Sequence, residues 1–220
     1  VLGLHVVSSA DLAKSEDVQH LRAEFHQRCA EASVPGKLAV EPGRIGRVIC
    51  DRARWSDLAI VNLAHPPAPQ PVAKLSSGFR TLIRRCPRPV LAVPGGPSSL
   101  SRALLGYDGS RKADEALFVA TYLAVRWDIA LVVVTALEGD LVKPEALVRA
   151  QEYLEAHDVR ATYVESEGSA ARAILATADQ NGCDLILMGG YGYSPVVEVV
   201  LGSAVDQVLR ESSQPILVCR

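Results

Sequence analysis

Residues 184–203, DLILMGGYGYSPVVEVVLGS, join an apolar run to a cluster of glycines. Gly189, Gly190 and Gly192 fill three of four consecutive positions, and a Gly202-Ser203 pair follows further along. A short apolar run that ends in glycine is typical of a buried strand followed by a tight loop. Glycine allows a positive φ and a close approach of the backbone, because it has no Cβ. The stretch therefore predicts a strand of a parallel sheet that carries a binding loop at its carboxyl end.

The composition is that of a globular protein with a substantial core. The chain has 220 residues, of which 49% are hydrophobic and 22% charged. No apolar run approaches the roughly 20 residues needed to span a bilayer, and the first residues lack the pattern of a secretion signal. The five cysteines form no C-x-x-C pair, and the five histidines lack the spacing of a helical zinc site. We therefore expect a cytoplasmic protein with reduced core thiols and no metal site.

In the second half of the chain, apolar runs rich in β-branched residues alternate with helical patterns. The predicted strands cover residues 103–107, 130–137, 160–165, 184–189 and 215–219. The helices between them begin near Ser110, Pro144 and Ser169, which are typical N-cap or first-turn residues. Strands that are apolar throughout need cover on both faces, so the pattern predicts an α/β domain with a parallel sheet.

The first half repeats this order, starting from the second strand. Residues 56–65 align with residues 183–192, and RPVLAV (88–93) aligns with QPILVC (214–219). The sequence therefore predicts a duplication, with domains at 1–97 and 98–220 and a turn-rich linker at 94–99. The first half has no counterpart of the strand and helix at 103–127, and this loss would leave two neighbouring strands short of a partner. We expect that Val1 is not the native start; a genuinely reduced half-domain is the alternative.

The motif Gly-x2-Gly-x9-Gly-Ser, which begins at Gly189, resembles the nucleotide loop of the universal stress protein family at every defined position. The resemblance covers residues 102–220, including the Asp108-Gly109-Ser110 turn, and extends weakly over residues 1–94. It implies two tandem open parallel-sheet domains of the Rossmann-like type, each with strand order 3-2-1-4-5. The first domain would be incomplete at its N-terminus.

The resemblance also implies ATP as the ligand, with or without magnesium. Backbone N–H groups at the glycines and at the start of the next helix would hold the phosphates. The adenosine contact of the family carries over to Asp108, and the adenine contact carries over to the backbone near Ala136. The implied binding residues are Asp108, Ala136, Gly189, Gly190, Gly192, Gly202 and Ser203. In the alternative interpretation, the glycines only form a tight turn, and Ser110 and Ser203 only cap helices.

The first half lacks this motif. Asn62, His65, Ser76 and Ser77 align with its four defined positions, with one extra residue between them and the segment PPAPQP (66–71) inside the loop. Prolines remove N–H donors and fix φ, so we expect no ATP site there. We interpret His65 as a loop residue, and Asp184, at the opposite end of its strand from the glycines, as structural.

The predicted function is that of an ATP-binding regulator of the stress response, not an enzyme. Two alternatives stay open, a slow ATP hydrolase of the same α/β group and a nucleotide-free interaction module. The sequence contains no G-x-x-x-x-G-K-[ST] loop, and no general base paired with a nucleophile is evident, so we expect any hydrolysis to be slow. Residues 1–97 contain 13 Lys and Arg against 8 Asp and Glu, and residues 98–220 contain 10 against 17, a balance that does not favour nucleic acid.

The resemblance bears on assembly as well, since universal stress proteins typically dimerise by pairing their fifth strands. Here both copies of that strand, Val90–Val93 and Ile216–Cys219, lie in one chain. An exposed apolar edge strand favours aggregation, and pairing removes that exposure. We therefore expect the two strands to pair antiparallel in an intramolecular pseudo-dimer, with a homodimer of two chains as a further option.

Overall fold

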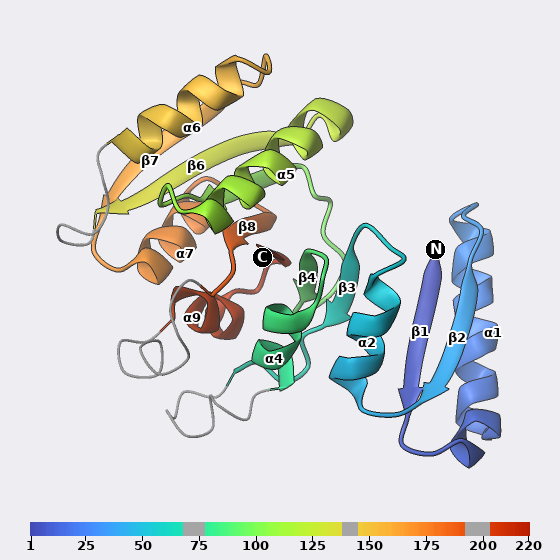
Figure 1. Ribbon diagram of the computed structural model, residues 1–220. Helices are drawn as coiled ribbons and strands as arrows, with labels where there is room; N and C mark the ends of the chain where they lie inside the picture. Colours follow the sequence, from blue (N-terminus) through green and yellow to red (C-terminus); the bar gives the residue numbers. More distant parts are fainter. Residues whose placement is uncertain (68–77, 138–144, 192–202) are drawn as a thin grey trace. The chain divides into compact units, whose positions relative to one another are not determined.

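The computed structural model describes residues 1–67, 78–137, 145–191 and 203–220 (Figure 1). The contacts within the chain define two compact units, Val1–Trp55 and Ser56–Arg220. Among the described residues, no helix is long and apolar enough to cross a membrane.

A seven-stranded sheet with the order β3-β4-β9-β8-β5-β6-β7 forms the centre of the larger unit. The five strands of the second half pair in parallel and have the predicted order 3-2-1-4-5, counted from β5. The strand bounds are β3 Ala59–Asn62, β4 Val90–Val93, β5 Arg102–Gly106, β6 Ala130–Leu137, β7 Ala161–Glu167, β8 Leu185–Gly189 and β9 Ile216–Cys219. The side chains of β8 and β9 are buried almost throughout, as expected for strands covered on both faces.

Helices cover both faces of this sheet (Figure 1). Their bounds are α4 Gly78–Arg85, α5 Arg111–Trp127, α6 Glu145–Glu155, α7 Ala170–Gln180 and α9 Ala204–Glu211. Buried residues of α5 and α6 pack with alternate residues of β5, β6 and β8 in one hydrophobic cluster. The side chains of Ala173, Ile174 and Thr177 on α7 are buried. The fold is therefore the α/β architecture expected from the alternating pattern.

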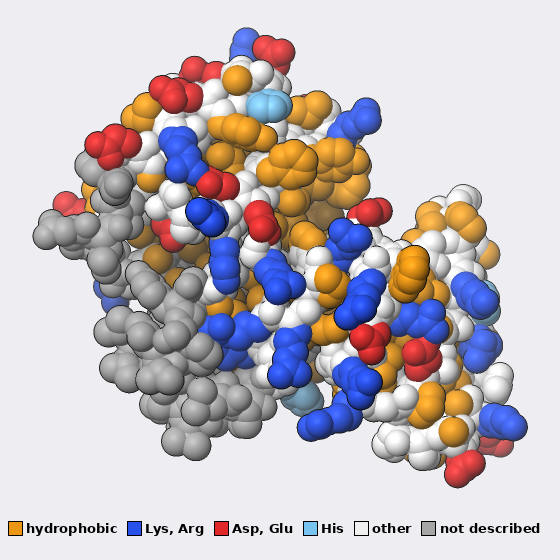
Figure 2. Space-filling model, in the orientation of Figure 1, with side chains coloured by type: hydrophobic (Ala, Val, Ile, Leu, Met, Phe, Trp, Pro, Cys, Tyr) orange, Lys and Arg blue, Asp and Glu red, His pale blue; other side chains and the backbone are white. Residues whose placement is uncertain are grey.

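Helix α5 shows how the sequence directs this packing. Ser110 is its N-cap, with an extended backbone and a side-chain oxygen that accepts a hydrogen bond from the Ala113 N–H. The buried side chains of the helix include Ala113, Leu117, Ala120 and Leu123, which share one face. The other face also carries large hydrophobic residues, so that Figure 2 shows apolar side chains gathered over α5. Phe118, Tyr122 and Val125 are 63%, 52% and 59% exposed there.

The fifth strands of the two halves, β4 and β9, pair antiparallel, as expected. Leu91 lies opposite Leu217, with Val90 opposite Val218 and Ala92 opposite Ile216. This pairing joins β3 and β4 to the sheet of the second half. The contacts therefore divide the chain at residues 55 and 56, whereas the predicted domains follow the sequence repeat and meet at residues 97 and 98.

The smaller unit contains β1 Leu2–Val7, the short 3-10 helix η1 Asp11–Lys14, α1 Glu16–Glu31, β2 Lys37–Pro42 and α2 Ile45–Ala53. Strands β1 and β2 form a parallel two-stranded sheet. In the second half, β5 lies between β6 and β8. Among the described residues, the first half contains no counterpart of β5, and its four strands form the separate pairs β1–β2 and β3–β4.

Candidate nucleotide site

The predicted site residues that the structure describes lie at the carboxyl end of the parallel strands. Gly106, the last residue of β5, is level with Val134 of β6 and Met188 of β8. Asp108 follows β5, Ala136 lies near the end of β6, and Gly189 ends β8. Ligands of open parallel sheets bind at this edge, next to the point where the strand order reverses. Gly192 and Gly202 lie outside the described residues.

The two described glycines of the motif are required by close packing. A Cβ on Gly189 would lie 2.9 Å from both the Lys112 carbonyl carbon and the Ala113 nitrogen. On Gly190 it would lie 2.8 Å from the Cys219 carbonyl oxygen. Of the two properties that glycine offers, a positive φ is not the one used at Gly189, which is not among the described glycines with a positive φ. Instead, the absence of a Cβ lets the end of β8 pack against the first turn of α5.

Asp108 lies in a compact turn between β5 and α5. Its Oδ1 accepts a hydrogen bond from the Ser110 N–H at 2.9 Å, and Gly109 has φ +75. The preceding Tyr107 is buried, and its hydroxyl donates to Asp114 Oδ1 at 2.7 Å. Burial, and next the hydrogen bond to Asp114, raise the pKa of Tyr107 well above its ordinary value, so the phenol stays neutral. These contacts hold the Asp108 turn in place while its carboxylate remains exposed.

Ser203 and Ser110 occupy equivalent N-cap positions but behave differently. The Ser110 side chain makes a capping hydrogen bond, whereas the Ser203 side chain makes none, although its backbone is extended as at other caps. Ser110 is therefore a helix cap, as in the alternative interpretation. The first N–H groups of α9 and the Ser203 hydroxyl can instead donate hydrogen bonds to a bound anion.

Sequence reasoning missed the residues that hold this site together. The Lys112 ammonium donates to the Tyr191 carbonyl oxygen, which ties the first turn of α5 to the residue after Gly190. The Tyr191 hydroxyl donates to Asp206 Oδ1 at 2.6 Å, and Asp206 also forms an ion pair with Arg80. A signal was present in the sequence, because Asp206 falls in the first turn of a helix, where a carboxylate is favoured.

Asp184 lies at the amino end of β8, far along the strand from the glycines, and its contacts are structural. Its carboxylate accepts hydrogen bonds from the Ser99 hydroxyl, from the Ser101 hydroxyl and N–H, and from the Arg102 N–H, at 2.6 to 3.0 Å. Burial raises the pKa of Asp184, but these hydrogen bonds together outweigh it and lower the pKa to about 2. The predicted linker is thus anchored at its end to the start of β8.

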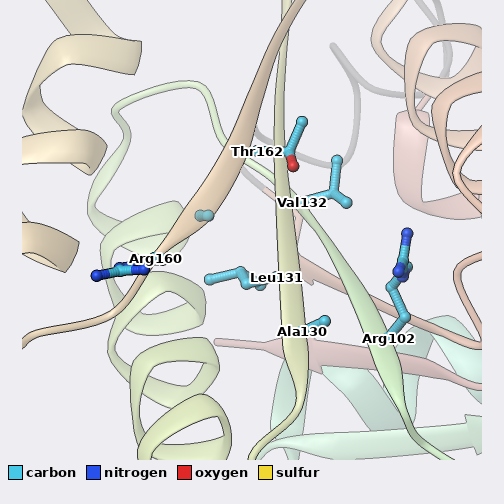
Figure 3. Close-up of a pocket in the computed structure, with 7 residues that line it drawn as sticks. Arg102, Ala130, Leu131, Val132, Arg160 and Thr162 are labelled. Carbon is cyan, nitrogen blue, oxygen red and sulfur yellow. The ribbon is translucent and has the colours of Figure 1, made fainter.

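A cavity of about 240 Å³ lies at the same amino-terminal end of the sheet. Its lining comes from β5, β6 and β7 and the residue before β7, and includes two arginines, Arg102 and Arg160. Figure 3 shows these two side chains on opposite sides of β6. They do not converge on one point, so the cavity does not form a two-arginine anion clamp.

The remaining candidates from the sequence carry no chemistry in the described part of the chain. All five cysteines are free, and Cys86, Cys183 and Cys219 are buried. Burial raises the pKa of Cys219 to about 12, with a further contribution from Glu115, so this thiol is unreactive. His65 is exposed in a loop. The described residues contain no group of three or more His, Cys, Asp or Glu placed to hold a metal ion.

Comparison with known proteins places this chain in a family. The model of the universal stress protein family matches residues 100–220, more than half of the chain. The chain belongs to this family. A universal stress protein of Synechocystis is 30% identical over 149 residues, which cover 66% of this chain and 52% of that protein, so the chain spans about half of the length of this relative. A universal stress protein of Thermus aquaticus is 36% identical over 132 residues, covering 53% of this chain and 96% of that protein.

Solved structures extend the likeness of fold into the first half. A universal stress protein from Archaeoglobus fulgidus has a TM-score of 0.77 at 21% identity, covering 93% of this chain and 76% of that one. A putative universal stress protein from Pseudomonas aeruginosa has a TM-score of 0.66 at 17% identity, covering 99% of this chain and 91% of that one. At these identities the similarity concerns the fold of the universal stress proteins and not their ligands.

Proposed function

We propose that this universal stress protein binds one ATP per chain, at the carboxyl edge of β5, β6 and β8, and acts as a regulator in the stress response. Gly189, Gly190 and Ser203, with the other two glycines of the motif, Gly192 and Gly202, would hold the phosphates. Asp108 would contact the adenosine end, and the backbone near Ala136 the adenine. The protein would act as a regulator by responding to whether ATP is bound.

One observation carries this proposal. The two described glycines let the end of β8, the end of β9 and the start of α5 meet at the edge of the sheet where an anion is favoured. Gly189 and Gly190 pack so closely on Lys112, Ala113 and Cys219 that no side chain could be added without displacing backbone. The start of α9 brings free N–H groups to the same edge, and the Ser203 hydroxyl is not used for capping. Free N–H groups at a helix N-terminus, together with an uncommitted hydroxyl, favour a phosphate over an uncharged ligand.

Titration of the chain with ATP, after removal of any copurified nucleotide, tests the proposal. We expect a stoichiometry of one, and an affinity roughly fivefold lower in Ser203→Ala, because one hydrogen bond to a phosphate is lost. Ser213→Ala is the control, since Ser213 is exposed at the other end of α9. Absence of binding, or two ATP per chain, would contradict the proposal and favour a nucleotide-free module or a second site in the first half.

We further propose that any hydrolysis is slow, so that ATP acts as a signal and not as a fuel. The motif supplies phosphate contacts, but among the described residues at this edge no general base is paired with a nucleophile. ATP would bind with or without magnesium, and any magnesium would be held without a dedicated cage of protein carboxylates. A steady-state assay for phosphate release tests this, and rapid multiple turnover would contradict it.

The antiparallel pairing of β4 with β9 supports a related proposal about assembly. We propose that one chain reproduces the family's dimer internally, with its first half in the place of a second subunit. Leu91 and Leu217, which face each other across the seam, would take the place of contacts between two subunits. In this arrangement the first half has lost its own nucleotide motif but still contacts the second half.

A further inference from the structure

Tyr191 joins the glycine motif to three helices. It follows Gly189 and Gly190 directly, and 2% of its surface is exposed. The Lys112 ammonium from α5 donates to its carbonyl oxygen, and its hydroxyl donates to Asp206 Oδ1 of α9 at 2.6 Å. Tyr191 and Ser203 flank the segment that holds the rest of the motif. The Tyr191–Asp206 hydrogen bond therefore links the residue before this segment to the helix that follows it.

The third helix, α4, contributes two arginines to this contact. The guanidinium carbons of Arg80 and Arg84 both lie 4.9 Å from the centre of the Tyr191 ring, a cation–π distance. Arg80 Nη1 also lies 3.6 Å from Asp206 Oδ2, and the side chains of this ion pair are 5% and 1% exposed. Figure 1 shows α4 and α9 side by side on one face of the sheet. Arg80 thus contacts both partners of the Tyr191–Asp206 hydrogen bond.

These residues come from both predicted domains. Helix α4 lies within residues 1–97, whereas Tyr191 and Asp206 lie within residues 98–220. The pairing of β4 with β9 brings them together. The half that lacks the nucleotide motif therefore supports the loop of the half that contains it.

We propose that Arg80 is a positioning residue for ATP, which holds the ends of the phosphate loop through Tyr191 and Asp206. The inference rests on the proposed function and deepens it, because it assigns control of the ATP site to α4 of the first half. Loss of the Arg80 charge would leave the buried Asp206 carboxylate without this cation and free the Tyr191 ring on one side. Holding Tyr191 and α9 in their positions would then become part of the cost of binding ATP, which lowers affinity.

The coupling is reciprocal. Whatever Arg80 contributes to ATP affinity, ATP contributes equally to the stability of the contacts between α4 and α9. Binding of ATP to the second half therefore stabilises the contacts of α4. This gives the first half a role in sensing the nucleotide that it does not itself bind.

The test compares Arg80→Met and Tyr191→Phe with the wild-type chain, using ATP and adenosine as ligands. Methionine keeps an unbranched apolar side chain but removes the charge, and phenylalanine removes only the hydroxyl that reaches Asp206. We expect ATP affinity to fall at least tenfold in Arg80→Met and about fivefold in Tyr191→Phe. Adenosine lacks phosphates, so its affinity should change by less than twofold. Arg85→Met is the matched control, because Arg85 is an exposed arginine of the same helix.

Circular dichroism and thermal unfolding without ligand establish that each variant is folded. Should Arg80→Met fail to fold, Tyr191→Phe, which changes one hydroxyl group, decides the matter. Unchanged ATP affinity in the folded variants would overturn the inference while leaving the proposed function intact. An equal loss for ATP and adenosine would also overturn it, because it would indicate a general structural effect. Failure of the wild-type chain to bind ATP would overturn the proposed function, and the inference with it.

Discussion

Replacing Asp184 by asparagine tests whether the linker is fastened to the sheet by a charge. The carboxylate accepts four hydrogen bonds, from Ser99, Ser101 and Arg102. Its pKa is about 2, against an ordinary value of 3.8. A shift of this size corresponds to at most about 2.5 kcal/mol, and partial exposure to solvent reduces the expected contribution to about 1 kcal/mol. The amide of Asp184→Asn retains one acceptor but turns a donor towards other donors, so we expect a total loss of about 2 kcal/mol near neutral pH.

The pH dependence distinguishes a charge effect from a packing effect. Because the pKa of Asp184 is lower in the folded state than in the unfolded state, its charge stabilises the fold fully above about pH 5. This contribution is lost as the pH falls from about 4 towards 2. Urea denaturation of the wild-type chain and Asp184→Asn should therefore give free energies of unfolding that converge towards low pH. Asp179→Asn, a change on the exposed side of α7, serves as the control and should shift unfolding by less than about 0.5 kcal/mol. A difference that is the same near pH 3 and near pH 7 would refute the reasoning.

Two further predictions concern the site and the seam. Gly189→Ala should destabilise the fold by about 1 to 3 kcal/mol and weaken ATP binding, because the added Cβ meets backbone atoms of Lys112 and Ala113 at 2.9 Å. Chemical denaturation measures the first effect and ATP titration the second. A stable variant with full ATP affinity would show that the close packing is not needed. Exchanging Leu91 and Leu217 for aspartate should separate β4 from β9, with a loss of several kcal/mol and aggregation visible by light scattering. Two like charges would lie opposite each other, the one at Leu217 buried and the one at Leu91 partly buried. A double variant that unfolds like the parent would argue against the intramolecular pseudo-dimer.

Local patterns in the sequence were sufficient to predict most of the second half. The apolar β-branched run at 130–137 gave β6, and Ser110 gave the start of α5, because burial on both faces and N-cap hydrogen bonding act over a few neighbouring residues. The structural interpretation of Asp184 also agrees with the structure, since it followed from the position of this residue at the start of its strand. The pairing of Val90–Val93 with Ile216–Cys219 was expected only through the resemblance to the family.

The sequence by itself determined the succession of strands and helices, the strand order through the family, and the position of the glycine motif. Only the tertiary structure decided what the glycines and charges do there. Gly189 serves a close contact with the first turn of α5, which depends on the distance between two elements and leaves no local signal. From its residue type alone, Arg80 would be assigned to the surface, yet it is 4% exposed and paired with Asp206. A buried charge is tolerated only where partners distant in the sequence compensate it, and the pairing of β4 with β9 supplies them.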